Sequence, residues 1–151
     1  MSRVELIVCE RTSRWAAALR MALAAAGEPC QLRETRRLPE LDTELSERPV
    51  SIAAIEVHRD NLANVLDWLP KARQRLARTR YVALADRSLA ADWDAVADAL
   101  TEAGVDALSS SPRRLEAVLD LARLQAKMPV IVDESEPLTT RVWASLPWQR
   151  R

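Results

Sequence analysis

The stretch VSIAAIEV, residues 50–57, is apolar at six of its eight positions. A short run of this kind, rich in β-branched residues, is typical of a central parallel strand whose two faces are both covered by helices. An amphipathic segment follows it, in which apolar residues recur at helical spacing: Leu62, Val65, Leu66 and Leu69. Together the two segments predict one strand–helix unit of an α/β sheet.

The chain on both sides of this unit repeats the same alternation. Further short apolar runs predict strands at residues 4–8, 30–34, 81–85 and 105–108. Amphipathic segments predict helices that begin near residues 13, 38, 93 and 111. Five strands in strict alternation with five helices predict a single doubly wound α/β domain, with a five-stranded parallel sheet and helices on both faces.

A few residues indicate where the helices begin or break. The hydroxyl of Thr12 or Ser13 is expected to cap the first helix. Pro70 is expected to kink or divide the helix after the central strand, because proline lacks an N–H and clashes with the preceding turn. Ser111 followed by Pro112 predicts the start of the last helix, with the serine as N-cap.

The composition is that of a globular domain and argues against several functions. The 151 residues carry 22 basic and 22 acidic side chains, so the balance gives no general attraction to nucleic acid or membranes. No apolar run approaches the roughly 20 residues that span a bilayer. The only two glycines, Gly27 and Gly104, are expected at helix C-caps, which leaves none for a phosphate-binding loop.

The two cysteines indicate a reducing compartment. Cys9 and Cys30 are too few for a disulfide framework. They are expected near opposite ends of neighbouring strands, on the order of 15 Å apart, which is too far to pair. The N-terminus also lacks the cleavage site of a signal peptide. These features predict a cytoplasmic protein with reduced thiols.

Certain residues at the ends of the predicted strands recur at a familiar spacing. Cys9 and Glu10 follow the first strand, Glu56 lies at the end of the central strand, Ala85 ends the fourth, and Ser111 precedes a proline after the fifth. With these intervals, residues 3–128 resemble the CheY-like receiver domain of bacterial response regulators. The resemblance implies a flavodoxin-like sheet with the strand order 2-1-3-4-5.

In receiver domains these positions carry the phosphoryl chemistry. An acidic pair holds Mg²⁺, an aspartate accepts the phosphoryl group, a threonine or serine follows that group, and a lysine neutralises its charge. This chain has Cys9 with Glu10, then Glu56, Ala85 and Ser111 in those places. Because phosphoryl transfer depends on positioning and charge stabilisation, the substitutions imply a degenerate phospho-acceptor site with no catalysis and no cofactor.

The resemblance and these losses imply a pseudo-receiver, which is a phosphorylation-independent protein–protein interaction module in bacterial signalling or regulation. The partners implied are proteins, and a homo-oligomer stays open. The alternative is a small-molecule or metal-binding flavodoxin-like domain that uses a remodelled acidic cleft. The polar residues expected along that cleft are Glu10, Glu56, His58, Asp60 and Asp86. No nucleophile–base pair supports an enzyme.

Residues 129–151 are predicted to form a C-terminal tail that follows the receiver-like domain of residues 1–128. The tail carries acidic residues and then the apolar anchors Trp143, Leu146 and Trp148. Apolar anchors beyond an acidic segment resemble a linear recognition element, so these three are candidate partner-docking residues. Whether they pack on their own domain or on another chain stays open. The basic run at residues 71–80 lacks interleaved aromatic residues, which does not favour nucleic acid as a partner.

Overall fold

Five strands pair in one parallel sheet in the order β2-β1-β3-β4-β5, as predicted. The structure is a computed structural model and describes residues 4–127. Its elements, in chain order, are β1 (Val4–Cys9), α1 (Arg14–Ala25), β2 (Cys30–Thr35), α2 (Leu38–Glu47), β3 (Ile52–Val57), α3 (Leu62–Arg75), β4 (Arg80–Ala85), the 3₁₀ helix η1 (Arg87–Asp92), α4 (Trp93–Ala103), β5 (Ala107–Ser109) and α5 (Glu116–Lys127).

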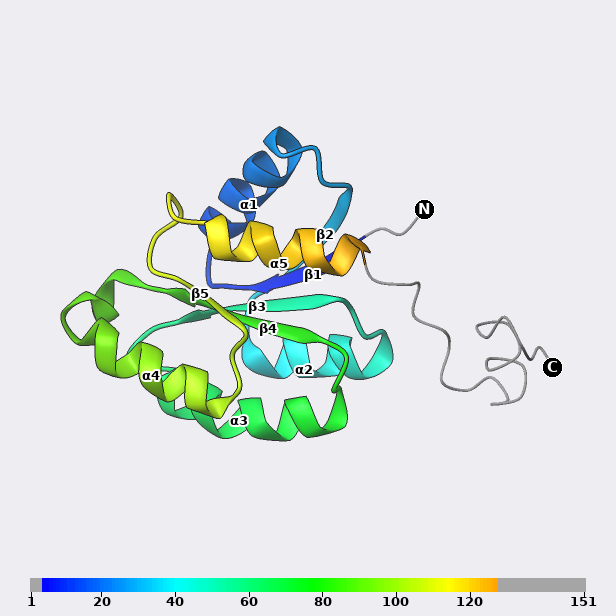
Figure 1. Ribbon diagram of the computed structural model, residues 1–151. Coiled ribbons are helices and arrows are strands. Elements are labelled where there is room, and N and C mark those ends of the chain that lie inside the picture. The colour runs from blue at the N-terminus through cyan, green and yellow to red at the C-terminus, as the bar shows by residue number, and fades with distance from the viewer. Residues whose placement is uncertain (1–3, 128–151) are drawn as a thin grey trace.

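The helices lie in two layers, one on each face of the sheet. Helices α1 and α5 cover one face, and helices α2, α3 and α4 cover the other (Figure 1). The central strand β3 is buried at all six of its positions. Coverage of both faces explains why its sequence is nearly continuous apolar residues rather than an alternation.

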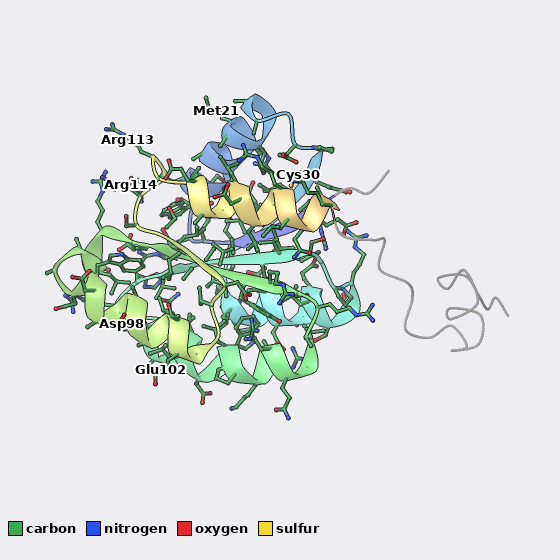
Figure 2. The ribbon with its side chains drawn as sticks, viewed as in Figure 1. Met21, Cys30, Asp98, Glu102, Arg113 and Arg114 are labelled. Carbon is green, nitrogen blue, oxygen red and sulfur yellow. The ribbon has the colours of Figure 1, made fainter. Side chains whose placement is uncertain are left out.

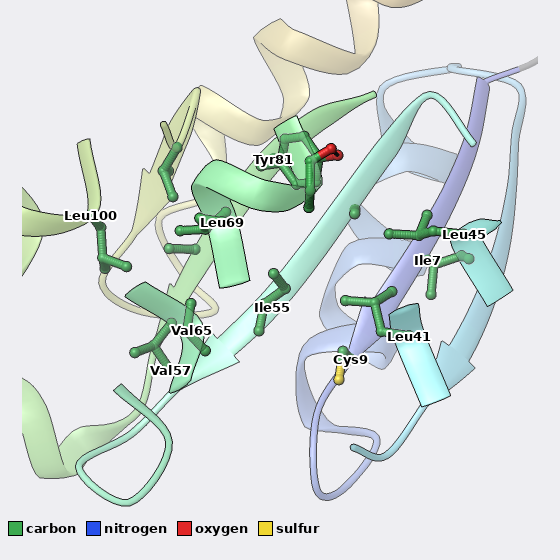
Figure 3. Packing of buried hydrophobic residues seen from close by; sticks show 14 of the residues in the cluster. Ile7, Cys9, Leu41, Leu45, Ile55, Val57, Val65, Leu69, Tyr81 and Leu100 are labelled. Atoms are coloured by element: carbon green, nitrogen blue, oxygen red, sulfur yellow. Dashed lines mark hydrogen bonds between the residues drawn. The ribbon is translucent and has the colours of Figure 1, made fainter. Parts of the chain in front are cut away.

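Each face of the sheet has its own hydrophobic core, and side chains fill both layers (Figure 2). On the side of α2, α3 and α4, Ile55 of the central strand packs in one cluster with Leu69 and Leu100 (Figure 3). On the other side, Trp15 of α1 and Val118 of α5 belong to the second cluster. Each fully buried aliphatic side chain contributes about 1.5–3 kcal/mol to stability. The two cores therefore stabilise the sheet, and the sheet fixes where its strands end.

Helix α3 runs through Pro70 without interruption, so of the two outcomes predicted for this proline, a kink or a division, the division is wrong. Val65, Leu69 and Ala72 of this helix are buried on both sides of the proline along the chain. Pro70 itself lies on the exposed side, where water can replace the missing hydrogen bond. Packing of the buried side therefore keeps the helix continuous.

The last helix begins at Glu116, later than predicted, and Ser111 is not its N-cap. The Arg114 amide donates to the Ser111 carbonyl over 2.9 Å. The Ser109 hydroxyl lies 2.7 Å from the Arg114 carbonyl. These bonds hold residues 111–114 in a turn, and Pro112 takes the second position of that turn instead of the first position of a helix.

Strand β5 begins at Ala107, two residues later than predicted. The Asp106 carboxylate accepts the Tyr81 amide over 2.8 Å, so a side chain takes the place of a backbone carbonyl just ahead of the strand. The 3₁₀ helix η1 between β4 and α4 was not predicted from the sequence.

The expected C-cap at Gly104 and the free thiols are confirmed, whereas the C-cap of α1 is Ala26 instead of Gly27. Both glycines have positive φ: Gly104, at 119°, directly follows α4, and Gly27, at 71°, follows Ala26. Cys9 pairs with Thr35 in the sheet register, whereas Cys30 pairs with Val4 at the other end of the same strands, and both thiols are free. Between residues 4 and 127, no helix is both long and apolar enough to cross a membrane.

Candidate functional site

The ends of β1, β3 and β4 bring most of the predicted site residues to one edge of the sheet. Cys9 lies opposite Ile55 in the register of β1 and β3, and Ala85 lies opposite Val57 in that of β3 and β4. Glu10 follows β1 directly, and Glu56 is the penultimate residue of β3. Parallel strands all end at this edge, which is where ligands bind in open α/β sheets.

Glu10 caps helix α1 with both of its carboxylate oxygens. The Trp15 amide donates to one oxygen over 2.9 Å, and the Ala16 amide donates to the other over 2.7 Å. The side chain is only 2% exposed. The hydroxyl of Thr12 or Ser13 was predicted to cap this helix. Thr12 accepts the amide of Arg14, the first residue of α1, over 3.4 Å, whereas the N-cap residue Ser13 makes no side-chain capping bond.

The environment of Glu10 acts on its charge in two directions. Burial raises the pKa of Glu10 above its ordinary value of 4.5, and the nearby Glu56 carboxylate raises it further. The two backbone amides lower the pKa, because they favour the ionised form. The first amides of a helix also carry the positive end of its dipole, which suits a carboxylate at this position.

Arg11 places a positive charge over the two remaining carboxylates of the edge. Its Nε lies 3.9 Å from Oε1 of Glu56, and its Nη2 lies 3.9 Å from Oδ1 of Asp86. The Arg11 amide also donates to Glu56 over 3.4 Å. The Glu56 side chain is buried, with 6% of its surface exposed, whereas the Arg11 side chain is 55% exposed. The arginine therefore closes the acidic edge from the solvent side.

A second layer of polar contacts fixes the loop that carries Glu10 and Arg11. Arg36, which follows β2, donates to the Thr12 carbonyl over 2.5 Å and to the Ser13 hydroxyl over 3.1 Å. Ser13 in turn donates to Glu34 over 2.9 Å. The loop from β1 to α1 is thus bonded to β2 and to the residue after it.

The loop after β3 is held by its own turn. The Asn61 side chain accepts the His58 amide over 2.8 Å and donates to the Glu56 carbonyl over 2.9 Å. His58 Nδ1 is buried and has no hydrogen-bond partner among residues 4–127. Asp60 is exposed on this turn. The turn accounts for the backbone around Glu56.

The loop after β4 is joined to the loop after β3. Asp86 accepts the Ser88 amide over 3.1 Å and caps η1. Burial alone would raise the pKa of Asp86, but the Ser88 bonds and the charge of Arg11 bring it below its ordinary value. Arg59 donates to the Ser88 carbonyl over 2.9 Å and pairs with Asp92 over 2.6 Å. These contacts lock the two loops together.

Ser111, the residue at the expected lysine position, contributes nothing to this edge in the described contacts. Its hydroxyl accepts the Arg113 amide over 3.2 Å, inside its own turn. Ala85 is buried to 6% exposure and has no hydroxyl to donate. Cys9 lies in the core cluster beside Ile7 and Leu41 (Figure 3). Burial raises the pKa of the Cys9 thiol, which disfavours the reactive thiolate.

The residues at this edge do not fit the Mg²⁺ that the receiver resemblance implies. A hard cation needs free carboxylate oxygens. Both oxygens of Glu10 already accept backbone amides, Cys9 replaces the other acid, and Arg11 lies over Glu56. In the part of the chain that the structure describes, no group of three or more His, Cys, Asp or Glu side chains could hold a metal ion. The predicted alternative of a metal cleft has no support in this geometry.

Two arginines that decide the geometry, Arg11 and Arg36, were missed by reasoning from the sequence. Arg11 directly follows Glu10, so an arginine beside the degenerate acidic pair was the available signal. Arg36 had no signal, because its contacts with the Thr12 and Ser13 loop depend on the pairing of β1 with β2. The predicted docking residues Trp143, Leu146 and Trp148 lie outside the described residues.

Comparison with known proteins gives similarity in structure but not in sequence. No protein-family model matches the chain, and no curated protein matches it. A CheY-like protein, tadZ, from Pseudomonas aeruginosa PAO1 is similar over 87% of this chain and 100% of its own, with a TM-score of 0.63 and 17% identity. A response regulator from Thermotoga maritima is similar over 84% of this chain and 100% of its own, with a TM-score of 0.66 and 16% identity.

A third similar structure is an atypical orphan response regulator described as having a phosphorylation-independent regulatory mechanism. It is similar over 83% of this chain and 97% of its own, with a TM-score of 0.61 and 13% identity. TM-scores of 0.61 to 0.66 over nearly the full length of the compared chains show a common fold, and identities of 13 to 17% show the fold alone.

Proposed function

Because this chain has the fold of a response-regulator receiver domain, we propose that it is a receiver-like module of a bacterial signalling or regulatory assembly. It works by binding protein partners and needs no phosphoryl group. No catalytic step belongs to this proposal. The observation that carries it is the state of the acidic edge, where Glu10 is bonded to helix α1 and Arg11 covers Glu56 and Asp86.

The charge balance of the edge supports this function. The guanidinium of Arg11 supplies, from within the chain, a cation beside the two carboxylates. An incoming phosphoryl group would add negative charge next to Glu56, with no metal ion to offset it and no lysine at position 111. The edge is therefore suited to one conformation rather than to a phosphorylation switch.

The shape of Glu56 argues in the same direction. Its carboxylate is one methylene further from the backbone than that of an aspartate, and it is 6% exposed. Its Oε1 receives the Arg11 amide and the Arg11 guanidinium. A nucleophile needs its reacting oxygen free and aligned with the phosphorus. Glu56 acts instead as the acceptor that orders the loop after β1.

The similar orphan response regulator with a phosphorylation-independent mechanism gives this proposal a precedent on the same fold. What such a module can still offer a partner is its surface, because the loops at the edge are locked by Arg36 and Arg59. We infer a constant binding surface whose activity is set by the amount of protein or by its partners.

The test is incubation of the full chain with acetyl phosphate and Mg²⁺, followed by intact mass measurement. A receiver with the full set of acidic, hydroxyl and lysine residues serves as the positive control. We expect no phosphoryl adduct and no change in partner capture after the treatment. An adduct on a carboxylate, or partner capture that depends on acetyl phosphate, would overturn the proposal.

A Mg²⁺ titration followed by Trp fluorescence examines the metal-cleft alternative, which a saturable change in fluorescence would support.

A further inference from the structure

An apolar groove lies between α1 and α5, on the face of the domain away from α2, α3 and α4. Its volume is about 410 Å³, which is within the range of about 300–1,000 Å³ for ligand-holding clefts. The apolar residues that line it come from α1 and from the turn and first half of α5: Ala18, Met21, Ala22, Pro112, Leu115 and Leu119. Arg113 and Glu116 are its polar lining residues.

Exposed apolar surface collects at this groove. Met21 is 75% exposed, and Figure 2 shows it projecting outward from α1, as Arg113 does ahead of α5. Among residues 4–127, the other exposed large hydrophobic residue is Leu124, at 61%. Leu124 lies about 140° around α5 from Leu119, so it faces away from the groove. Met21 and the apolar lining residues thus form one continuous exposed apolar surface on this face of the domain.

We propose that this groove binds the apolar segment of the chain's own C-terminal tail, residues 142–148. The segment supplies Val142, Trp143, Leu146 and Trp148. Two indoles and two aliphatic side chains match a groove with six apolar lining residues. The guanidinium of Arg113 at the rim suits stacking on an indole, and the Glu116 carboxylate can accept an indole N–H.

The chain is long enough to make this contact. Helix α5 ends at Lys127 and also lines the groove through Leu119. Eight residues of helix separate the two, which is about 12 Å. Trp143 lies sixteen residues after Lys127, and sixteen residues reach at most about 53 Å. The segment therefore reaches the groove with more than enough chain to turn back along α5.

The groove of the same chain is favoured over that of a second copy. A binding segment tethered to the molecule that carries its site acts at an effective concentration on the order of millimolar. A second copy at micromolar concentration competes poorly with such a tethered segment. The proposal thus assigns the docking residues of the tail to their own domain. It is independent of the phosphorylation proposal, since the groove does not include the acidic edge.

The test uses the full chain and the methyl group of Met21 as a reporter in NMR spectra. An indole docked beside Met21 shifts its methyl resonance through the ring current. We expect the resonance to move to the position of an exposed methionine in Trp143→Ala and Trp148→Ala. Thr139→Ala in the tail and Leu124→Ala on the far side of α5 are the matched controls, and they should leave the Met21 resonance in place.

Dilution distinguishes docking of the tail within one chain from docking of the tail of a second copy. A shift that persists on dilution and is lost in the tryptophan variants supports docking within one chain. A Met21 resonance that is the same in the wild type and in both tryptophan variants overturns the proposal. A shift that disappears on dilution also overturns it, because the tail of a second copy then fills the groove.

Discussion

Replacing Glu10 by alanine should destabilise the protein far more than the same substitution at Glu40. Both glutamates accept two backbone amides at the start of a helix: Glu10 from Trp15 and Ala16, and Glu40 from Arg36 and Arg37. They differ in burial, since Glu10 is 2% exposed and Glu40 is exposed. The pair therefore isolates the effect of burying a capping carboxylate.

The magnitude follows from the bonds of Glu10. Each hydrogen bond to a charged acceptor contributes about 1.5–3 kcal/mol, so two contribute about 3–6 kcal/mol. The pKa of Glu10 is raised, so burial and the Glu56 charge outweigh the effect of the two amides on the ionised form, and the net contribution lies well below that sum. We expect Glu10→Ala to lower the free energy of unfolding by about 2–4 kcal/mol, because two buried amides lose their acceptor. Glu40→Ala should cost about 0.5–1 kcal/mol, since water replaces its exposed carboxylate.

The measurement is urea denaturation of both variants and the wild type, followed by far-ultraviolet circular dichroism. A domain with about 5–15 kcal/mol of stability stays folded after either substitution, so both values are measurable. If the two variants lost the same stability within about 0.5 kcal/mol, Glu10 would not be committed to helix α1. The carboxylate would then be free to bind a cation, and the argument for a locked site would fail.

Three further predictions concern the site and the fold. Burial raises the folded pKa of Glu10, so the part of the stability that is linked to this shift is fully present below pH 4.5 and is lost as the pH rises through the folded pKa. The stability of the wild type relative to Glu10→Gln should therefore fall across that window in urea titrations, and a rise would contradict the prediction. Arg11→Ala should cost less than about 1 kcal/mol in urea denaturation, because the arginine is largely exposed, and a loss above about 2 kcal/mol would contradict this. Gly104→Ala should cost about 2–3 kcal/mol and Gly27→Ala about 1–2 kcal/mol. Both positions have positive φ, but only at residue 104 would the added methyl group meet a neighbour, Arg73 Cδ at 2.1 Å. Equal melting temperatures for the two variants would contradict this.

The amino-acid sequence by itself determined the order and type of the main elements. The apolar stretch at residues 50–57 contains β3, and the helix predicted to begin near residue 38 is α2, which begins at Leu38. Gly27 and Gly104 both lie at helix C-termini with positive φ. These features are local, because hydrophobic periodicity and the conformational freedom of glycine act within a few residues. The strand order came with the family resemblance, and the sheet confirms it.

Tertiary structure decided the features that depend on partners distant in the chain. Packing of α3 on the sheet keeps the helix intact through Pro70, against its local tendency. The bond between Ser109 and the Arg114 carbonyl holds the turn that delays α5. Such outcomes follow from burial and hydrogen bonds that a local pattern does not contain.

The site itself shows the same division. The sequence identifies Glu10 as the remnant of an acidic pair, but it does not say where the carboxylate points. In the folded chain, the amides of Trp15 and Ala16 are the donors within reach, and Arg11 lies between Glu56 and Asp86 because β1, β3 and β4 end side by side. A charged side chain binds the donors and counter-charges that folding places within about 4 Å of it, and only the tertiary structure places them there.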